Sequence, residues 1–225
     1  MWLLLAAVGI AGVPEDVATA ADTNLPTALR QQAFDRLAQP GGADALVAFV
    51  GDKDSPPPQR WVAVRALGPM GDDPSRVALL RFLAATDAQT RMAALGAIGD
   101  RGDTSLSGYA AARLEDPALL VRAAAAEALG KLKDPGTLGD LDRALSDPTN
   151  HYRGTSLWFR THLVQAIATI GTDAAVPLLA RVIDDADADV ARAAIVGLEK
   201  IAGFSYAEGR TADQERAAWK RWAGK

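Results

Sequence analysis

The chain of 225 residues contains no cysteine. Without thiols it cannot form disulfides, thiolate zinc sites or lipid-modified cysteines, and it has no cysteine nucleophile. Histidine is nearly as scarce, with His151 and His162 alone. A zinc site needs three or four nitrogen, sulfur or oxygen ligands together, and neither histidine has a second one at metal-ligand spacing. We therefore expect no metal site and no cofactor.

Positive charge is not in excess. Lysine and arginine total 24 against 28 aspartate and glutamate residues, which gives a net charge of −4. Nucleic-acid binding depends on a basic stripe that neutralises phosphates, and the sequence offers none. No nucleic-acid partner is expected.

Motifs for catalysis and for ion binding are missing as well. There is no G-x-S-x-G nucleophile motif, and the turn at 99–102 lacks the flanking strand that a phosphate loop requires. Asp185, Asp187 and Asp189 resemble the start of a calcium loop, but an EF-hand needs glycine at position six and glutamate at twelve, where this chain has Val190 and Val196. These absences favour a protein that is not an enzyme.

An apolar run, WLLLAAVGIAGV at 2–13, is too short for a transmembrane helix, which needs about 20 residues. With Ala18-Thr19-Ala20 as an A-x-A cleavage site, residues 1–20 resemble a secretory signal. The sequence thus predicts export to the periplasm or the extracellular space, with no stable membrane span. The alternatives are a cytoplasmic protein and a first helix that covers the core.

What the chain does contain is an internal repeat of about 31 residues. Small or large apolar residues follow each of six arginines at offsets of three, four and, with one exception, seven. The arginines are Arg30, Arg60, Arg91, Arg122, Arg160 and Arg192. Offsets of three, four and seven lie on one face of a helix, so each arginine should begin an amphipathic helix. After Ile195 and Val196 the pattern drifts.

A second set of amphipathic segments lies between these helices, at 43–52, 75–86, 104–116, 137–147 and 173–185. Asp-Pro pairs predict N-caps with proline at the first helical position. They are Asp73-Pro74, Asp116-Pro117, Asp134-Pro135 and Asp147-Pro148. Helix ends with positive φ are predicted at Gly71, Gly102, Gly171 and Gly203.

Two helices per repeat, joined by tight turns, form a hairpin that cannot bury its apolar stripe alone. Stacking neighbours buries it in a continuous core. We therefore predict an all-α fold, a right-handed α-solenoid (superhelix) of about six antiparallel helix-hairpin repeats over residues 21–205. Residues 206–225 are predicted to form a C-terminal capping helix from about Thr211, with Trp219 and Trp222 on one face.

The segment VRAAAAEALGKLKDP at 121–135 resembles a HEAT repeat of the short type found in phycobilisome-linker lyases, as do 60–74 and 91–103. The resemblance implies an armadillo-like helical fold. It also implies a protein-binding scaffold in most members, while a few attach bilins or excise damaged bases. In this family the repeat arginine commonly pairs with an acidic residue of the inter-repeat turn. Such pairs would join Asp54, Asp87, Asp116 and Asp187 to Arg60, Arg91, Arg122 and Arg192. The alternative is an anion-binding row.

The second helix of each hairpin should line the concave wall of the stack, with offsets one and five facing away from the core. An insertion near 149–156, in the one long spacing of 38 residues between Arg122 and Arg160, adds loop residues that can bind or remain solvated. The candidate interaction surface comprises Trp61, Arg65, Glu127, His151, Tyr152, Arg153, Trp158 and Gln165. The two tryptophans are also consistent with gap-filling in the core.

We therefore predict a non-enzymatic scaffold that binds a protein or peptide on this concave face. Two alternatives stay open, namely a HEAT-like enzyme of the bilin-lyase or base-excision kind and an architectural subunit of an envelope complex.

Overall fold

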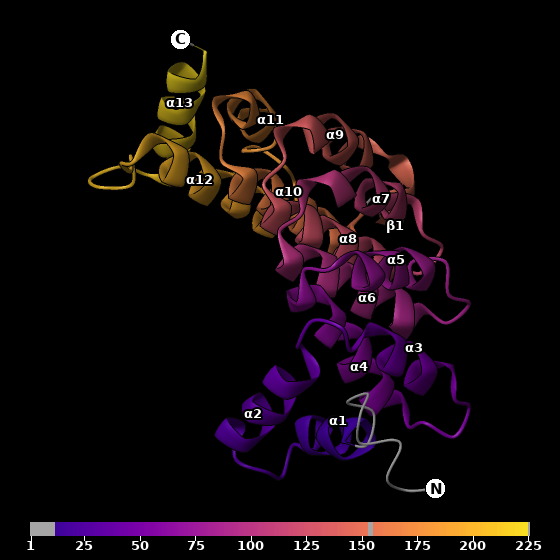
Figure 1. The fold of residues 1–225 in the computed structure, drawn as a ribbon. Coiled ribbons are helices and arrows are strands. Elements are labelled where there is room, and N and C mark those ends of the chain that lie inside the picture. The colour runs from indigo at the N-terminus through magenta and orange to yellow at the C-terminus, as the bar shows by residue number, and fades with distance from the viewer. Residues whose placement is uncertain (1–11, 153–154, 225) are drawn as a thin grey trace, which may run out of the picture. The chain divides into compact units, whose positions relative to one another are not determined.

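The computed structural model describes residues 12–152 and 155–224. The chain divides into two compact units, Met1–Arg101 and Gly102–Lys225 (Figure 1). Both are built from helices that follow one another as antiparallel hairpins, so the predicted all-α solenoid fold is confirmed. Most of the Trp2–Val13 run lies outside the described residues.

The first unit consists of three hairpins. Its helices are α1 (Val13–Ala21), α2 (Thr27–Leu37), α3 (Ala43–Gly51), α4 (Pro57–Met70), α5 (Asp73–Phe82) and α6 (Ala88–Arg101). The long second helices α4 and α6 pack side by side, and α1 packs on α2 and α4.

The second unit continues the pattern, with 3₁₀ turns at several helix starts. It contains η1 (Thr104–Leu106), α7 (Ser107–Ala111), η2 (Ala112–Glu115), α8 (Leu119–Leu132), η3 (Pro135–Thr137), α9 (Leu138–Ser146), η4 (Pro148–Asn150), β1 (His151–Tyr152), β2 (Thr155–Ser156), α10 (Phe159–Ile170), η5 (Asp173–Ala175), α11 (Val176–Arg181), α12 (Ala188–Ala202) and α13 (Ala212–Ala223). Helix α10 lies between α8 and α12 and packs against both.

The predicted apolar stripes form the core of both units. In α4, α6, α8 and α10 the residues at offsets three, four and seven are fully buried. They are Ala63, Val64, Leu67, Ala94, Leu95, Ile98, Ala125, Ala126, Leu129, Leu163, Val164 and Ile167. Burial of apolar area on this scale is the main term that stabilises such a stack.

Helix α12 departs from the predicted stripe. Its buried side chains are Val190, Ala194 and Leu198, while Val196 is 51% exposed. The placement of Val196 in the core was therefore wrong. The physical reason is that helix α13, which follows α12, packs mainly against α11 and covers little of α12.

Glycine ends the helices where the sequence indicated. Gly71, Gly102, Gly171 and Gly203 have φ values of 73°, 70°, 67° and 77°, in the left-handed region that glycine adopts without strain.

The aspartate caps are correct in part. Asp134 and Asp147 cap the 3₁₀ turns η3 and η4, with proline at the first position. Helix α5 is capped one residue earlier than predicted, by Asp72, which accepts the Ser75 amide at 2.9 Å. Asp116 accepts the Ala118 amide in the turn before α8 and does not cap the helix directly. In both cases the helix starts within a residue or two of the proline, where either aspartate reaches a free amide.

The insertion near 149–156 forms a short antiparallel ladder, with His151 opposite Ser156 and Tyr152 opposite Thr155. It lies between η4 and α10. Arg153 lies outside the described residues, and of Tyr152 the structure describes only the backbone.

Within the second unit, helix α13 packs through aromatic side chains against the segment that connects it to α12. Trp219 is fully buried, stacks on Phe204 with ring centroids 5.6 Å apart, and meets Tyr206 and Trp222 edge-on. Thr211 and Gln214 form a capping box at the start of this helix.

Candidate functional site

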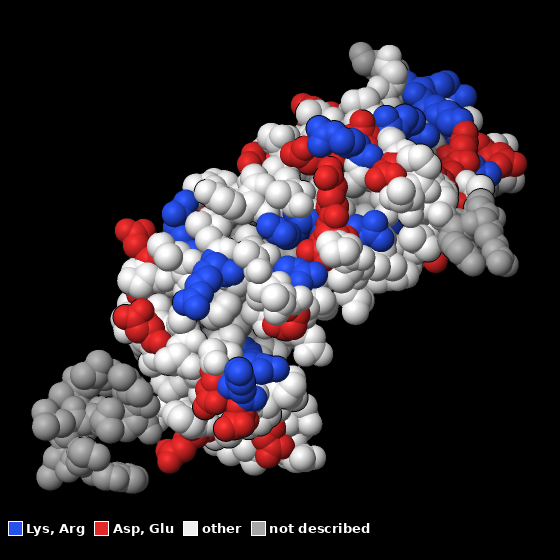
Figure 2. Space-filling view, turned by 90° about the vertical axis from the view of Figure 1, so that its right-hand side faces the viewer, with Lys and Arg blue, Asp and Glu red and all other residues white. Residues whose placement is uncertain are grey.

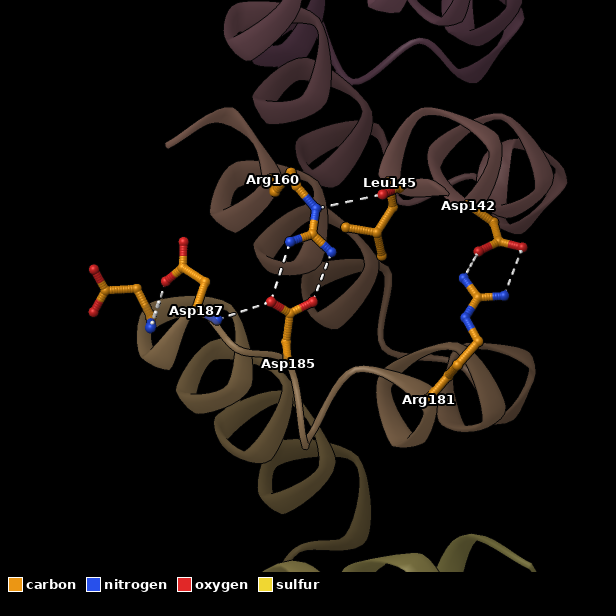
Figure 3. Close-up of polar contacts among 7 residues, drawn as sticks. Asp142, Leu145, Arg160, Arg181, Asp185 and Asp187 are labelled. Atoms are coloured by element: carbon orange, nitrogen blue, oxygen red, sulfur yellow. Dashed lines mark hydrogen bonds and ion pairs between the residues drawn. The ribbon is translucent and has the colours of Figure 1, made fainter. Parts of the chain in front are cut away.

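One of the repeat arginines, Arg160, ties two consecutive hairpins together through an aspartate that the sequence analysis did not name. Arg160 of α10 donates two hydrogen bonds to Asp185, of 3.1 and 2.7 Å, and a third, of 3.4 Å, to the Leu145 carbonyl (Figure 3). Only 7% of the Arg160 side chain and 15% of the Asp185 side chain are exposed. Asp185 lies in the turn before α12, so the acidic partner comes from the following repeat and not from the turn before the arginine.

Two of the aspartates named in the prediction serve as turn and cap residues. Asp87 accepts the Thr90 amide and Asp187 accepts the Asp189 amide, at 2.8 and 2.9 Å. The Arg91 guanidinium donates to the carbonyls of Ala85 and Thr86.

Burial and hydrogen bonding compete at Asp185. Burial disfavours its charged form, but hydrogen bonds from Arg160 and from the Asp187 amide outweigh this cost, and the pKa of Asp185 is lowered. At the equivalent turn, the Thr149 amide, the Thr149 hydroxyl and the charge of Arg122 together lower the pKa of Asp147. The repeat arginines Arg160 and Arg122 therefore have a structural role, since each stabilises the charged form of an aspartate in a turn.

A second link joins the first helices of neighbouring hairpins. Arg181 of α11 makes two hydrogen bonds to the carboxylate of Asp142 of α9 (Figure 3). Over most of the face seen in Figure 2, acidic and basic side chains are interspersed, which offers no wide field of one sign.

Two candidate residues lie on α4 in the first unit. Trp61 is 36% exposed, so it does not fill the core. Arg65 is paired with Asp100 of α6 and lies directly over Gly96, where a Cβ would be 1.7 Å from Nη1 of Arg65. Arg65 thus fastens α4 to α6, and its charge is already matched.

The remaining candidates belong to the second unit. Glu127 of α8 forms an exposed ion pair with Lys131 at 2.9 Å. Trp158, at the start of α10, is 44% exposed and meets the His162 ring edge-on at 4.6 Å. His151 is exposed in β1. Gln165 lines the groove described next, and Glu127, His151 and Trp158 are not among the residues that line that groove.

Gln165 lies in a groove between α10 and α12 with a volume of about 530 Å³. The residues that line it are Thr161, Gln165, Ala168, Thr169, Asp189, Arg192, Ala193, Val196, Gly197 and Lys200. Thr161, Gln165, Ala193 and Gly197 are the offset-one and offset-five positions of these helices. The groove therefore lies on the face of both helices that the sequence indicated.

Small residues give the groove its floor. Gly197 is buried, and a Cβ there would be 2.6 Å from the Cβ of Ala168, so the two helices approach closely at this point. Longer side chains stand on either side of the floor. Gln165 and Thr169 come from α10, and Arg192, Val196 and Lys200 come from α12.

Sequence reasoning missed Arg192, Val196 and Lys200 as a set. The signal was present, because residues four apart on a helix share a face. The signal was overlooked because the repeat pattern predicted that Arg192 would form a structural ion pair with an aspartate and that Val196 would be buried in the core.

A second hollow, of about 640 Å³, lies between α12 and α13. Its carboxylates are mostly engaged, since Asp184 pairs with Arg216 and Lys220 and Asp185 pairs with Arg160. Glu199 accepts the Ser205 hydroxyl. These ion pairs hold α13 in place and favour a structural role for the hollow.

Residues 12–152 and 155–224 contain no group of three or more histidine, aspartate or glutamate side chains arranged to hold a metal ion. In the same residues, none of the helices combines the length and the hydrophobicity that crossing a bilayer demands.

Comparison with known proteins supports the resemblance that the sequence suggested. Residues 77–158 match the family model described as HEAT repeats. Comparison with curated proteins gave no match.

Several solved structures share the fold. An engineered protein is 18% identical, with a TM-score of 0.55 over 86% of this chain and 90% of that one. The karyopherin Kap121p, bound to the extreme C-terminus of the protein phosphatase Cdc14p, is 14% identical, with a TM-score of 0.54 over 84% of this chain and 25% of that one. CpcE and CpcF of phycocyanin lyase from Nostoc sp. PCC7120 are 20% identical, with a TM-score of 0.48 over 84% and 76%. For the engineered protein and Kap121p, the likeness at these identities concerns the fold alone.

Proposed function

We propose that this chain of HEAT repeats is a non-enzymatic interaction scaffold that binds a segment of another protein on the face formed by the second helices of its hairpins. In the second unit the binding site is the groove between α10 and α12. The observation that carries the proposal is the groove itself. Its floor of small residues and its flanking polar side chains lie on the outward face of two helices whose other faces are buried.

The shape of the groove favours a chain segment over a small molecule. It is an open trough between the surfaces of two neighbouring helices, and hydrogen-bonding and charged side chains stand on its sides together with Val196. Small-molecule sites usually enclose most of the surface of the ligand. The Kap121p complex named above is a precedent for a similar fold that holds the terminal segment of another protein.

Site-specific photo-crosslinking in native extracts tests the proposal. A photoreactive amino acid in place of Gln165 should crosslink to a discrete partner. The same amino acid in place of Arg143, 70% of whose side chain is exposed on α9, is the matched control and should not. Equal crosslinking at both positions would contradict the assignment of this face.

The candidate tryptophans are tested in the same extracts. Trp61→Ala and Trp158→Ala remove exposed aromatic side chains, which often anchor partners at interfaces. Loss of the crosslinked partner in either variant would extend the binding surface to that helix, and an unchanged yield would restrict it to the groove.

A further inference from the structure

Three side chains of α12 form a stripe along one side of the α10–α12 groove. Arg192, Val196 and Lys200 are spaced four residues apart and all line the groove. Val196 is 51% exposed and lies between the two cations along the helix. The order along the helix is therefore cation, apolar, cation.

Among the described residues, none forms a hydrogen bond or an ion pair with the side chain of Arg192 or Lys200. This distinguishes Arg192 from Arg160, the equivalent residue one repeat earlier, which is buried against Asp185. Asp189 supplies the one carboxylate among the described residues of the groove, so the lining charge is positive by one unit.

The spacing of the stripe matches the repeat of an extended peptide. Four residues of helix rise by about 6 Å. Two residues of extended chain advance by about 6.6 Å, and side chains two apart point to the same side. Alternate side chains of an extended segment can therefore meet Arg192, Val196 and Lys200 in turn.

We propose that the groove binds an extended segment of another protein in which two carboxylate side chains, four residues apart, flank an apolar side chain. The carboxylates pair with Arg192 and Lys200, and the apolar side chain covers Val196. On the opposite side, the Gln165 amide lies within the same groove to bond the peptide backbone. This inference rests on the proposed function and adds the chemical class of the ligand.

A helical ligand fits the stripe less well. Its carboxylates would need to be eight residues apart, and the helix diameter of about 10 Å would hold it above the floor at Ala168 and Gly197. A basic segment would meet two like charges and only one carboxylate.

The probe is a short fluorescent peptide with the order aspartate, serine, valine, serine, aspartate, capped at both ends. Binding to the full chain is measured by fluorescence anisotropy at low salt and again at high salt. We expect saturable binding that weakens as salt rises, because exposed charge pairs are screened. One control peptide replaces both aspartates with asparagine, and another removes one serine so that the two carboxylates point to opposite sides.

Variants of the protein identify the groups that act. Arg192→Gln and Lys200→Gln should each weaken binding of the aspartate peptide by roughly threefold, as for exposed ion pairs. Asp189→Asn should strengthen binding, because it removes a negative charge that repels the carboxylates of the peptide. Arg221→Gln, an exposed cation on α13 outside the groove, should leave binding unchanged.

The outcomes separate the two proposals. The acidic-ligand inference would be overturned if the aspartate and asparagine peptides bound equally and neither Arg192→Gln nor Lys200→Gln changed the binding. The groove would then still be a peptide-binding site. Absence of binding by every peptide, together with no crosslink from position 165, would overturn both. Salt-sensitive self-association of the chain that Arg192→Gln abolishes would overturn the inference in favour of a second copy of this chain as the occupant.

Discussion

Gly68 lies at a close approach of α4 to α6. A Cβ at this position would be 2.5 Å from the carbonyl oxygen of Ala97, a backbone atom that cannot turn away. We predict that Gly68→Ala destabilises the first unit by about 2 kcal/mol through overpacking. Denaturant unfolding followed by circular dichroism measures the change.

Gly139 is the matched control for that substitution. It lies in α9, and a methyl group added there would have nothing within 4 Å, so Gly139→Ala should stabilise the chain by about 0.5 kcal/mol through helix propensity. Equal effects of the two substitutions would contradict the close-packing explanation.

Asp185 gives the stability a defined pH dependence. Because its pKa is lowered in the folded chain, the unfolded chain binds the proton more readily, and stability falls as protons are added. The contribution is complete above the ordinary carboxyl pKa of about 3.9 and is lost as pH falls through the lower folded value. Asp185→Asn should therefore reduce stability at pH 7 and flatten the acid limb of a plot of unfolding free energy against pH.

Calorimetric or denaturant unfolding between pH 7 and pH 3 checks this expectation. Curves for the wild type and the variant that run parallel throughout would show that the Arg160–Asp185 pair does not titrate as described. Removal of Arg160 itself should cost about 3 kcal/mol or more, because it leaves a carboxylate buried without its partner.

At the scale of the elements, the stability of the first turn of α13 depends on the capping box at the start of this helix. The Thr211 side chain accepts the Gln214 amide, and the Gln214 side chain accepts the Thr211 amide. Thr211→Ala should cost about 1 kcal/mol and increase hydrogen exchange in the first turn of α13. Thr211→Ser retains the hydroxyl and should restore protection, and an alanine variant that exchanges like the wild type would contradict the role of the cap.

Element by element, the amphipathic pattern anticipated most of the structure. The stripes of α4, α6, α8 and α10 are buried as the offsets predicted, because a helix period of 3.6 residues places those offsets on one face whatever the neighbours are. Helix α12 departs from this pattern. Its neighbour α13 is not another repeat, and the sequence period carries no information about how the last helix packs.

At the scale of the whole molecule, cleavage of the predicted export signal would also change the stability of the chain, because the cleavage site lies in α1. Val17 and Ala20 of α1 are buried, and α1 packs on α2 and α4. Cleavage after Ala20, which the sequence predicts, would remove these contacts. We expect a chain of residues 21–225 to be less stable than the full chain by roughly 2 kcal/mol, the value of one buried aliphatic side chain.

Thermal unfolding of the two chains measures that difference, and equal melting temperatures would show that α1 contributes nothing to the first unit. Export remains a prediction. The N-terminal residue of the protein purified from its native source decides it, since cleavage after Ala20 would leave Ala21 first.

The sequence by itself determined the class of fold, the length of the repeat, the buried face of most helices and the glycines that end them. These follow from local periodicity and backbone geometry, which each segment carries within itself. The tertiary structure alone decided that Arg160 pairs with the aspartate of the next repeat, that Arg65 pairs with Asp100, and that Arg192 and Lys200 stay unpaired among the described residues, beside an exposed Val196. Which acidic and basic side chains form ion pairs depends on the distances between helices that are far apart in the sequence. The periodicity of apolar residues within one helix gives no information about those distances.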